Sequence, residues 1–260
     1  MSATASAASS FTHEMSGRRV LVTGAGSGIG LATAQLLMQA GAQVVAVVQN
    51  SAQQQTVQPL LAQASVLVQD LLDDAACAAL PERAAQALGG PLQGLALCAG
   101  VFYKKSSDDT ALDEWRHTLA LNLTATFVLA RAGIAHMRQA SVSGASVVVV
   151  SSQIGRVGHA RGAAYAASKA ALNGMVRSLA LEWAAVGIRI NAVGPGPIDT
   201  PMVAAAKADP AAIHRILSGI PMGRLGQAHE IAEVMSFLLS PRASFLTGQL
   251  LCVDGGFTAQ

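Results

Sequence analysis

The stretch that decides the fold is RRVLVTGAGSGIGLATAQLLMQAGAQVVAVV, residues 18–48. It opens with a short apolar run, Val20 to Val22, which is typical of a buried parallel strand. Glycines follow at once, and the apolar residues after them recur at helical spacing as far as Gly41, where a helix would end. A second apolar run, Val44 to Val48, completes a βαβ unit, whose connection we expect to be right-handed.

The glycine turn inside this unit predicts a nucleotide site. Gly24, Gly28 and Gly30 permit a tight turn and let backbone N–H groups approach a pyrophosphate closely. The start of the following helix adds its partial positive charge. Such a glycine pattern is a weak signal on its own, but its place between a strand and a helix supports the interpretation. A plain glycine-rich turn is the alternative.

The rest of the chain continues to alternate strand-like runs with helical patterns. We expect further strands within residues 64–70, 92–100, 144–152, 187–196 and 248–256. We expect helices near residues 73–88, 110–139, 162–186 and 228–239. This order predicts an α/β fold, a Rossmann-like, doubly wound, seven-stranded parallel sheet with helices on both faces. A single dinucleotide-binding catalytic domain should cover residues 17–260, after a flexible N-terminal segment, residues 1–16.

Composition excludes several classes of function. The 260 residues carry a net charge of only +2, and no Lys/Arg cluster predicts nucleic-acid binding. The three cysteines lie far apart without CxxC spacing, so we expect neither a disulfide framework nor a metal site. No uninterrupted apolar run reaches the roughly 18 residues of a membrane span, and residues 1–16 do not resemble a signal peptide. We therefore expect a cytoplasmic protein without a membrane anchor.

A tyrosine and a lysine stand four residues apart in GAAYAASKAALNGMV, residues 162–176. On a helix, Tyr165 and Lys169 share one face. A nearby ammonium favours a phenolate, so we expect Lys169 to lower the pKa of Tyr165 and make it a general acid/base. The alternative is a packed tyrosine beside a lysine whose stem covers apolar surface.

Two polar residues precede this pair at informative places. Ser152 ends the strand predicted over residues 144–152, where its hydroxyl could hold a substrate oxygen, although serine is also a common turn residue. Asn122 lies in the middle of the helix predicted over 110–139, where an amide is a poor helix former. It could bind water or bend the helix there.

Taken together, these motifs resemble the classical short-chain dehydrogenase/reductase family over nearly all of residues 17–258. TGAGSGIG (23–30) resembles the cofactor turn of that family, and Asn122, Ser152, Tyr165 and Lys169 match its catalytic set in order and spacing. PGPIDT (195–200) resembles its nicotinamide-carboxamide segment, and residues 220–257 resemble its C-terminal region.

The resemblance implies an NAD(P)-dependent oxidoreductase that interconverts a secondary alcohol and a ketone. Tyr165 would exchange a proton with the substrate oxygen, Lys169 would bind the nicotinamide ribose, Ser152 would polarise the carbonyl, and Asn122 would hold a water. The expected cofactor contacts are Gly24, Ser27, Gly28, Ile29, Gly30, Gln49, Asp70, Leu71, Ala99, Gly100, Tyr165, Lys169, Pro195, Gly196, Ile198 and Thr200. The expected substrate contacts are Ser152, Gln153, His159, Tyr165 and Met202, with Tyr103 nearby.

Two positions depart from what the family implies. The family usually has Asn-Asn-Ala-Gly after its fourth strand, where this chain has Leu97-Cys98-Ala99-Gly100, so the local backbone could be less firmly held. At the end of the second strand, the cofactor-selecting positions are Val48 and Gln49, which carry no charge. The choice between NAD and NADP therefore stays open, with a preference for NADP because no carboxylate repels its 2′-phosphate.

Residues 200–220 form a long connection that could close over a substrate or simply pack as surface helices. The resemblance implies a homotetramer, in which helices 110–139 and 162–186 form one interface and the C-terminal strand a second. The substrate would be a small alcohol or ketone, either an acyl-thioester, as for 3-oxoacyl-thioester reductases, or a sugar or other secondary alcohol.

Rival functions are weaker. A hydrolase of the α/β type would need a GxSxG motif, which the chain lacks. HEIAE (229–233) has Glu233 where a zinc motif needs a second histidine. A dinucleotide-binding sensor or scaffold without turnover, or an isomerase or dehydratase on the same fold, remains an alternative. Substituting Tyr165 separates the first of these from an oxidoreductase.

Overall fold

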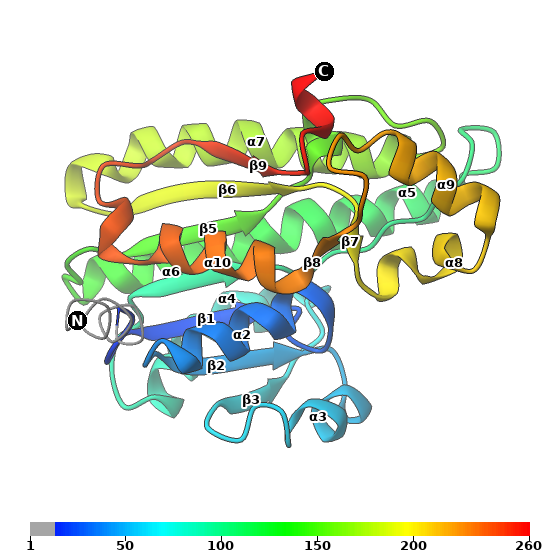
Figure 1. Ribbon diagram of the computed structural model, residues 1–260. Coiled ribbons are helices and arrows are strands. Elements are labelled where there is room, and N and C mark those ends of the chain that lie inside the picture. The colour runs from blue at the N-terminus through cyan, green and yellow to red at the C-terminus, as the bar shows by residue number, and fades with distance from the viewer. Residues whose placement is uncertain (1–13) are drawn as a thin grey trace, which may run out of the picture.

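The computed structural model describes residues 14–260 and contains the predicted parallel sheet (Figure 1). Seven strands are hydrogen-bonded in the order β3-β2-β1-β4-β5-β6-β9, and every neighbouring pair is parallel. The doubly wound fold expected from the sequence is therefore confirmed. The strands are β1 (Arg19–Thr23), β2 (Gln43–Val48), β3 (Ser65–Val68), β4 (Gly94–Leu97), β5 (Ser146–Val150), β6 (Arg189–Pro195) and β9 (Leu250–Val253).

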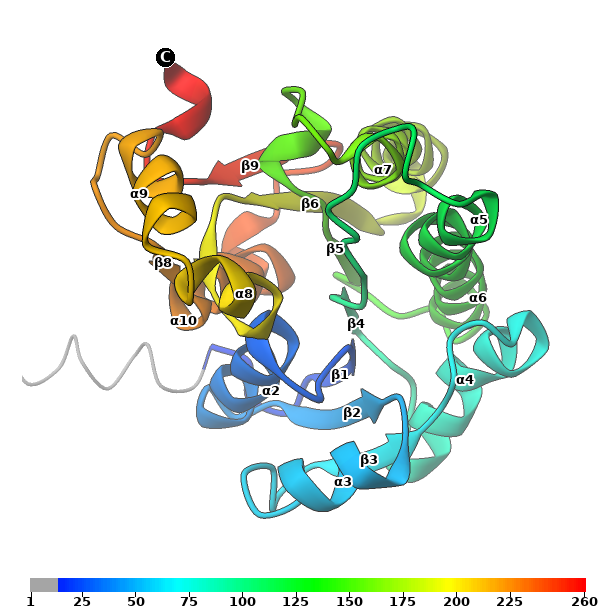
Figure 2. The same ribbon diagram turned by 90° about the vertical axis from the view of Figure 1, so that its right-hand side faces the viewer.

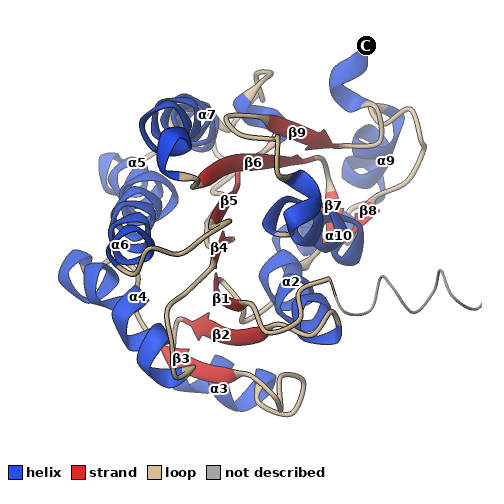
Figure 3. Cartoon of the chain, turned by 90° about the vertical axis from the view of Figure 1, so that its left-hand side faces the viewer, coloured by secondary structure: helices blue, strands red, loops and turns tan. Residues whose placement is uncertain are grey.

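Helices cover both faces of this sheet (Figure 3). One face carries α4 (Asp74–Ala87), α5 (Leu112–Leu119), α6 (Ala125–Gln139) and α7 (Ala163–Trp183). The other carries α2 (Gly28–Gln39), α3 (Ser51–Val57) and α10 (Ala228–Leu239). The segment between β6 and α10 holds α8 (Ala204–Lys207), α9 (Pro210–Ser218) and a short strand pair, β7 (Ile198–Asp199) with β8 (Gly226–Gln227).

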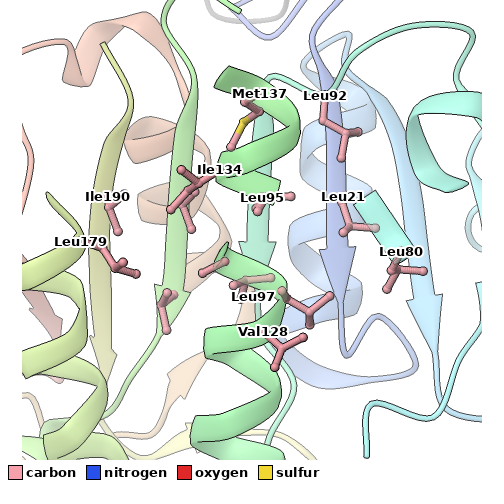
Figure 4. Packing of buried hydrophobic residues seen from close by; sticks show 14 of the residues in the cluster. Leu21, Leu80, Leu92, Leu95, Leu97, Val128, Ile134, Met137, Leu179 and Ile190 are labelled. Atoms are coloured by element: carbon pink, nitrogen blue, oxygen red, sulfur yellow. The ribbon is translucent and has the colours of Figure 1, made fainter. Parts of the chain in front are cut away.

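The strand pleat divides the apolar side chains between two cores. Leu21 of β1 packs on the face covered by α4, α6 and α7, whereas its neighbours Val20 and Val22 pack under α2 and α10. Figure 4 shows part of the first core, where Leu95 and Leu97 of β4 lie beside α6 and Leu21 of β1 lies toward Leu80 of α4. Burial on both faces explains why these strands read as continuous apolar runs.

The carboxyl ends of the strands meet at one edge of the molecule, which faces the viewer in Figure 2. In sheets of this topology, ligands bind beyond these ends, where the helices on the two faces diverge. Helices α8 and α9 lie beside the same edge (Figure 2). The residues that follow β1, β4, β5 and β6 are thereby brought together, although they are far apart in the sequence.

Three local features differ from the sequence predictions. The helix expected over residues 110–139 is interrupted by a π-helical turn, Ala120–Thr124, which contains Asn122. Such turns insert an extra residue and frequently mark functional sites. Helix α3 was not predicted, because only Val57 of its seven residues is buried and no apolar period appears. The pair β7–β8 has two residues a strand, too few to give a pattern.

The domain begins before residue 17. Met15 is fully buried, and its backbone N–H donates to Ala40 O at 3.0 Å, so residues 14–16 pack against the end of α2. The expected flexible segment, residues 1–16, otherwise lies outside the described residues. By length and composition, one described stretch, Leu112–Gln139, could cross a membrane, but 50% of the tested window is buried inside the fold, as in a core helix.

Candidate active site

The glycine turn after β1 presents backbone to the cleft at the strand ends. Gly24 has φ = +67°, and a Cβ there would stand 2.9 Å from Ala99 Cα. A Cβ at Gly30 would strike the carbonyl oxygen of Gly24. Helix α2 begins at Gly28, and Ser27 before it makes no side-chain cap hydrogen bond. The first-turn amides are therefore available to an anion, which fits the pyrophosphate of a dinucleotide.

One cleft of about 1070 Å³ runs across the carboxyl ends of the strands. Its lining residues extend from Gln49, after β2, to Arg215 and Ile216 of helix α9. All the residues that the sequence predicted as cofactor or substrate contacts border this cleft: Gly24, Ser27, Gly28, Ile29, Gly30, Gln49, Asp70, Leu71, Ala99, Gly100, Ser152, Gln153, His159, Tyr165, Lys169, Pro195, Gly196, Ile198, Thr200 and Met202. Their individual roles stay predictions. Asn122 is fully buried behind the cleft.

Tyr165 and Lys169 lie one turn apart on α7 and border the cleft together. Both side chains are largely enclosed, with 9% and 2% of each residue exposed. The ammonium stands 5.5 Å from the centroid of the Tyr165 ring and donates to Val150 O, at the end of β5, at 2.8 Å. That hydrogen bond fixes the lysine between the helix and the sheet.

The predicted pKa shift of Tyr165 is wrong in direction. Burial raises the pKa of Tyr165 to about 12, because the phenolate loses solvation, while a hydrogen bond with Ser152 lowers it. The ammonium of Lys169, 5.5 Å from the ring centroid, does not offset the effect of this burial. Burial also lowers the pKa of Lys169 to about 8. At pH 7 the site therefore holds a neutral phenol beside a mostly protonated amine.

Ser152 is placed by the turn that follows β5. Its backbone is extended, and its Oγ accepts a hydrogen bond from Ile154 N at 3.1 Å, which caps a short 3₁₀ turn. The cap expected as the simpler role of this serine is thus present. The same hydroxyl also reaches Tyr165, so the two oxygens lie side by side at the cleft.

Asn122 ties three parts of the site together. In the π-helical turn, its Oδ1 accepts from Val101 N at 2.8 Å and its Nδ2 donates to Val101 O at 3.0 Å. The Nδ2 also donates to Ser168 Oγ at 3.1 Å, and that hydroxyl donates to Tyr165 O at 2.7 Å. The amide therefore positions both the loop after β4 and helix α7. The predicted water-binding role of Asn122 stays a prediction.

The backbone at Cys98, where the family usually has asparagine, is held by a residue of the neighbouring strand. Thr23 Oγ1 accepts from Cys98 N at 3.1 Å and from Ala99 N at 3.4 Å. Burial raises the pKa of the Cys98 thiol to about 12, so this thiol is not ionised at neutral pH. Together with Asn122, Thr23 holds the segment whose rigidity the sequence left in doubt.

The substrate end of the cleft has polar atoms that no described residue satisfies. Among residues 14–260, Gln153 Oε1 and His159 Nδ1 are buried without a hydrogen-bond partner. Burial, and secondarily the charge of Lys104, lowers the pKa of His159, which keeps its ring neutral at pH 7. Buried polar atoms without partners are costly, so these two atoms are available to a ligand, and their role as substrate contacts stays a prediction.

Sequence reasoning missed several cleft residues. Phe102 packs on Tyr165 with ring centroids 4.6 Å apart, and it also contacts the edge of His159. The position of Phe102 after the carboxyl end of β4 was the available signal. Arg215 of α9 lines the cleft as well, next to Ile216, which belongs to the connection 200–220 that was expected to close over a substrate or to pack as surface helices. Nothing in the local pattern distinguishes Arg215 from a residue of an ordinary surface helix, because its placement depends on how α9 folds back over the strand ends.

Comparisons with known proteins agree with this geometry. Residues 24–258 match the family model described as enoyl-(acyl carrier protein) reductase. The chain is 40% identical over 246 residues to cis-4-hydroxycyclohexanecarboxylate dehydrogenase of Sinomonas cyclohexanicum, covering 93% of this chain and 97% of that protein. It is 32% identical over 247 residues to 2-dehydro-3-deoxy-D-gluconate 5-dehydrogenase of Bacillus subtilis, covering 95% and 96%.

Solved structures are similar over the whole domain. A Beutenbergia cavernae protein assigned as an NAD(P)-dependent gluconate 5-dehydrogenase, with NADP at low occupancy, has 35% identity and a TM-score of 0.89, covering 95% of this chain and 98% of that one. An Agrobacterium tumefaciens protein assigned as a 2-deoxy-D-gluconate 3-dehydrogenase, with bound NADP, has 34% identity and a TM-score of 0.86, covering 95% and 98%. The chain therefore belongs to the short-chain dehydrogenase/reductase family and is an NAD(P)-dependent oxidoreductase that acts on CH–OH groups.

Proposed function

We propose that the protein interconverts a secondary alcohol and its ketone with NADP(H), and that Tyr165 transfers the proton. The observation that carries this proposal is the grouping of Ser152, Tyr165 and Lys169 at the cleft, beside a backbone cradle suited to a dinucleotide. When bound, the nicotinamide supplies the hydride chemistry. The protein supplies the binding, the orientation and the proton.

In ketone reduction, the neutral phenol of Tyr165 is the proton donor. Burial holds this phenol in its protonated form at pH 7, with a pKa of about 12, so a proton is always present at Oη. The Ser152 hydroxyl beside it donates to the same substrate oxygen and stabilises the charge that develops there. In alcohol oxidation the phenol has to ionise first, so we expect this direction to be favoured at alkaline pH.

Lys169 acts at the cofactor side of the site. Its ammonium is fixed by Val150 O at 2.8 Å and borders the cleft near Gly100, so it is positioned to bind ribose hydroxyls. The backbone amides at the start of α2 would hold the pyrophosphate of the cofactor. Ile198 and Thr200 would hold the carboxamide of its nicotinamide.

The alcohol substrate is a compound that carries a carbon ring or several hydroxyl groups. The relatives are named for 4-hydroxycyclohexanecarboxylate, a deoxygluconate and glucose, each of which carries a secondary hydroxyl. Gln153 and His159 provide polar contacts for a second oxygen on the substrate. Assays of cyclohexanols, hydroxycyclohexanecarboxylates, gluconates and acyl-thioesters, followed at the nicotinamide absorbance, test this proposal. A chain that binds NADPH but turns over no alcohol or ketone would be a sensor or scaffold instead.

We propose NADPH as the preferred cofactor, because the end of β2 carries no carboxylate. Val48 is buried, Gln49 is exposed, and Asp70, at the end of β3, is the only acidic residue among those lining the cleft. A fluorescence titration should give a lower Kd for NADPH than for NADH. Gln49→Arg should lower the Kd for NADPH about tenfold and leave that for NADH within twofold, since only NADPH carries a 2′-phosphate. Tighter binding of NADH to the unaltered protein would contradict the proposal.

We also propose that the protein is a homotetramer in the cytoplasm. Apolar side chains stand exposed on α5, α6 and α7, and another, Phe245, is fully exposed before β9. Two separate apolar regions suit two interfaces. The three cysteines are unpaired, which suits a reducing compartment.

A further inference from the structure

Two cations line the substrate end of the cleft without a partner. Lys104, on the loop between β4 and α5, and Arg215, on α9, both border the cleft and are exposed. Among residues 14–260, neither side chain makes an ion pair or a hydrogen bond, whereas other exposed cations do. The adjacent Lys105, for example, pairs with Glu114.

Acidic groups do not balance these cations. Among the residues that line the cleft, the only carboxylate is Asp70, and its Oδ1 accepts a hydrogen bond from Leu72 N. Asp70 follows β3, which is the edge strand of the sheet, whereas Ser152 follows β5, which three strands separate from β3. Figure 2 shows β3 at the opposite end of this edge from α7 and α9. The positive charge is therefore concentrated at the substrate end.

Lys104 has neighbours among the residues around Tyr165, and Arg215 stands on the helix that lies beside the carboxyl ends of the strands. Lys104 lies close enough to His159 to influence its pKa, and Phe102, two residues earlier, packs on Tyr165 at 4.6 Å. Arg215 is followed by Ile216, which also lines the cleft, as does Met202. A ligand that reaches from Tyr165 to the cations would thus pass apolar walls and then meet positive charge.

We propose that the substrate is a hydroxy acid or keto acid, whose carboxylate is bound by Lys104 and Arg215 while its oxygen to be oxidised or reduced faces Tyr165 and Ser152. This inference rests on the proposed alcohol–ketone reaction and specifies its substrate class. A guanidinium matches a carboxylate with two parallel hydrogen bonds, and an ammonium adds a point charge. The apolar walls between them suit a carbon ring or short chain separating the hydroxyl from the carboxylate.

Matched pairs of substrates test this assignment, with 4-hydroxycyclohexanecarboxylate and 3-hydroxybutyrate each compared with its uncharged carboxamide. The full-length protein should oxidise at least one acid with kcat/KM about tenfold or more above that of the amide. Arg215→Met and Lys104→Met should each raise KM for the acid about tenfold, which corresponds to about 1.4 kcal/mol, and change KM for the amide less than twofold. Rising ionic strength should also raise KM for the acid alone.

Controls separate substrate binding from effects on the cofactor. Lys105→Met and Lys207→Met remove exposed cations that do not line the cleft, and should leave both KM values unchanged. The Kd values for NADPH and NADH should stay within twofold in all variants. A selective loss of NADPH or NADH binding in Arg215→Met or Lys104→Met would instead assign the cations to cofactor phosphates and overturn the proposal.

Different results would contradict the carboxylate assignment and the alcohol–ketone reaction. Equal kcat/KM for acids and amides, or turnover of neutral alcohols alone, would overturn the carboxylate assignment and leave the alcohol–ketone reaction standing. Absence of turnover with every alcohol and ketone tested, while NADPH still binds, would overturn both.

Discussion

At the scale of single residues, burial rather than the lysine determines the charge state of the tyrosine. Tyr165 and Lys169 are enclosed by α7, β5 and Phe102, and each is pushed toward its uncharged form. The sequence predicted the pair and its shared helix face but not this outcome. Spacing along a helix shows which side chains share a face, whereas the distance to solvent and the hydrogen bond to Val150 O depend on the whole fold.

The buried ammonium should make the stability of the protein depend on pH. The pKa of Lys169 is lowered from 10.5 to about 8, so between these values the unfolded chain binds a proton that the folded protein does not. The free energy of unfolding therefore gains a contribution that rises with pH across this window. Denaturant unfolding should show that the free energy of unfolding rises with pH by about 2 kcal/mol less in Lys169→Met than in the unaltered protein, between about pH 8 and pH 10. The exposed Lys105→Met should keep the slope of the unaltered protein, and an unchanged slope in Lys169→Met would refute the account.

At the scale of elements, the strands and long helices could be predicted because their apolar residues recur with a clear period. The features that escaped prediction have physical reasons. Helix α3 buries only Val57, β7 and β8 are too short for a pattern, and the π-helical turn around Asn122 differs from an α-helix by one residue. Asn122 itself was identified, yet its hydrogen bonds to Val101 and Ser168 join segments 21 and 46 residues away.

Helices α8 and α9 are the elements that should respond most to the cofactor. Several of their residues line the cleft, but none of them is buried. The outer faces of both helices are therefore exposed to solvent. We expect NADPH to slow amide hydrogen exchange in residues 204–218 about tenfold or more. Helix α10, which packs against α2 and the sheet, is the internal reference and should show little change. Equal exchange in α8 and α9 with and without NADPH would mean that they are surface packing rather than a lid.

At the scale of the whole molecule, several large apolar side chains are exposed on the helices that cover one face of the sheet. Between 36% and 85% of the surface is exposed for four of them: Leu112 and Trp115 of α5, Phe127 of α6 and Leu181 of α7. Burial in an assembly would explain them. The resemblance to the family implied an interface on helices 110–139 and 162–186, which are apolar on most sides, and this interface stays a prediction. The sequence could not place Arg215 above the cleft, because that position arises only when α9 folds back across the strand ends.

Phe127→Glu tests the assembly. A charge on the face formed by α5, α6 and α7 should dissociate the predicted tetramer into smaller species, as measured by light scattering during size-exclusion chromatography. Leu60→Glu, at an exposed apolar residue after α3 on the other side of the sheet, is the matched control and should leave the mass unchanged. A monomeric unaltered protein, or a tetrameric Phe127→Glu, would rule out this interface.

The most direct test of the account is the hydroxyl of Tyr165, which Tyr165→Phe removes while keeping the ring that packs on Phe102. We predict that kcat/KM for the best alcohol falls about a thousandfold, within the range for loss of a general acid/base. The Kd for NADPH should change less than twofold, because Lys169 and the glycine turn are untouched. Turnover within tenfold of the unaltered protein, with cofactor binding intact, would contradict the assignment of Tyr165 as the proton donor.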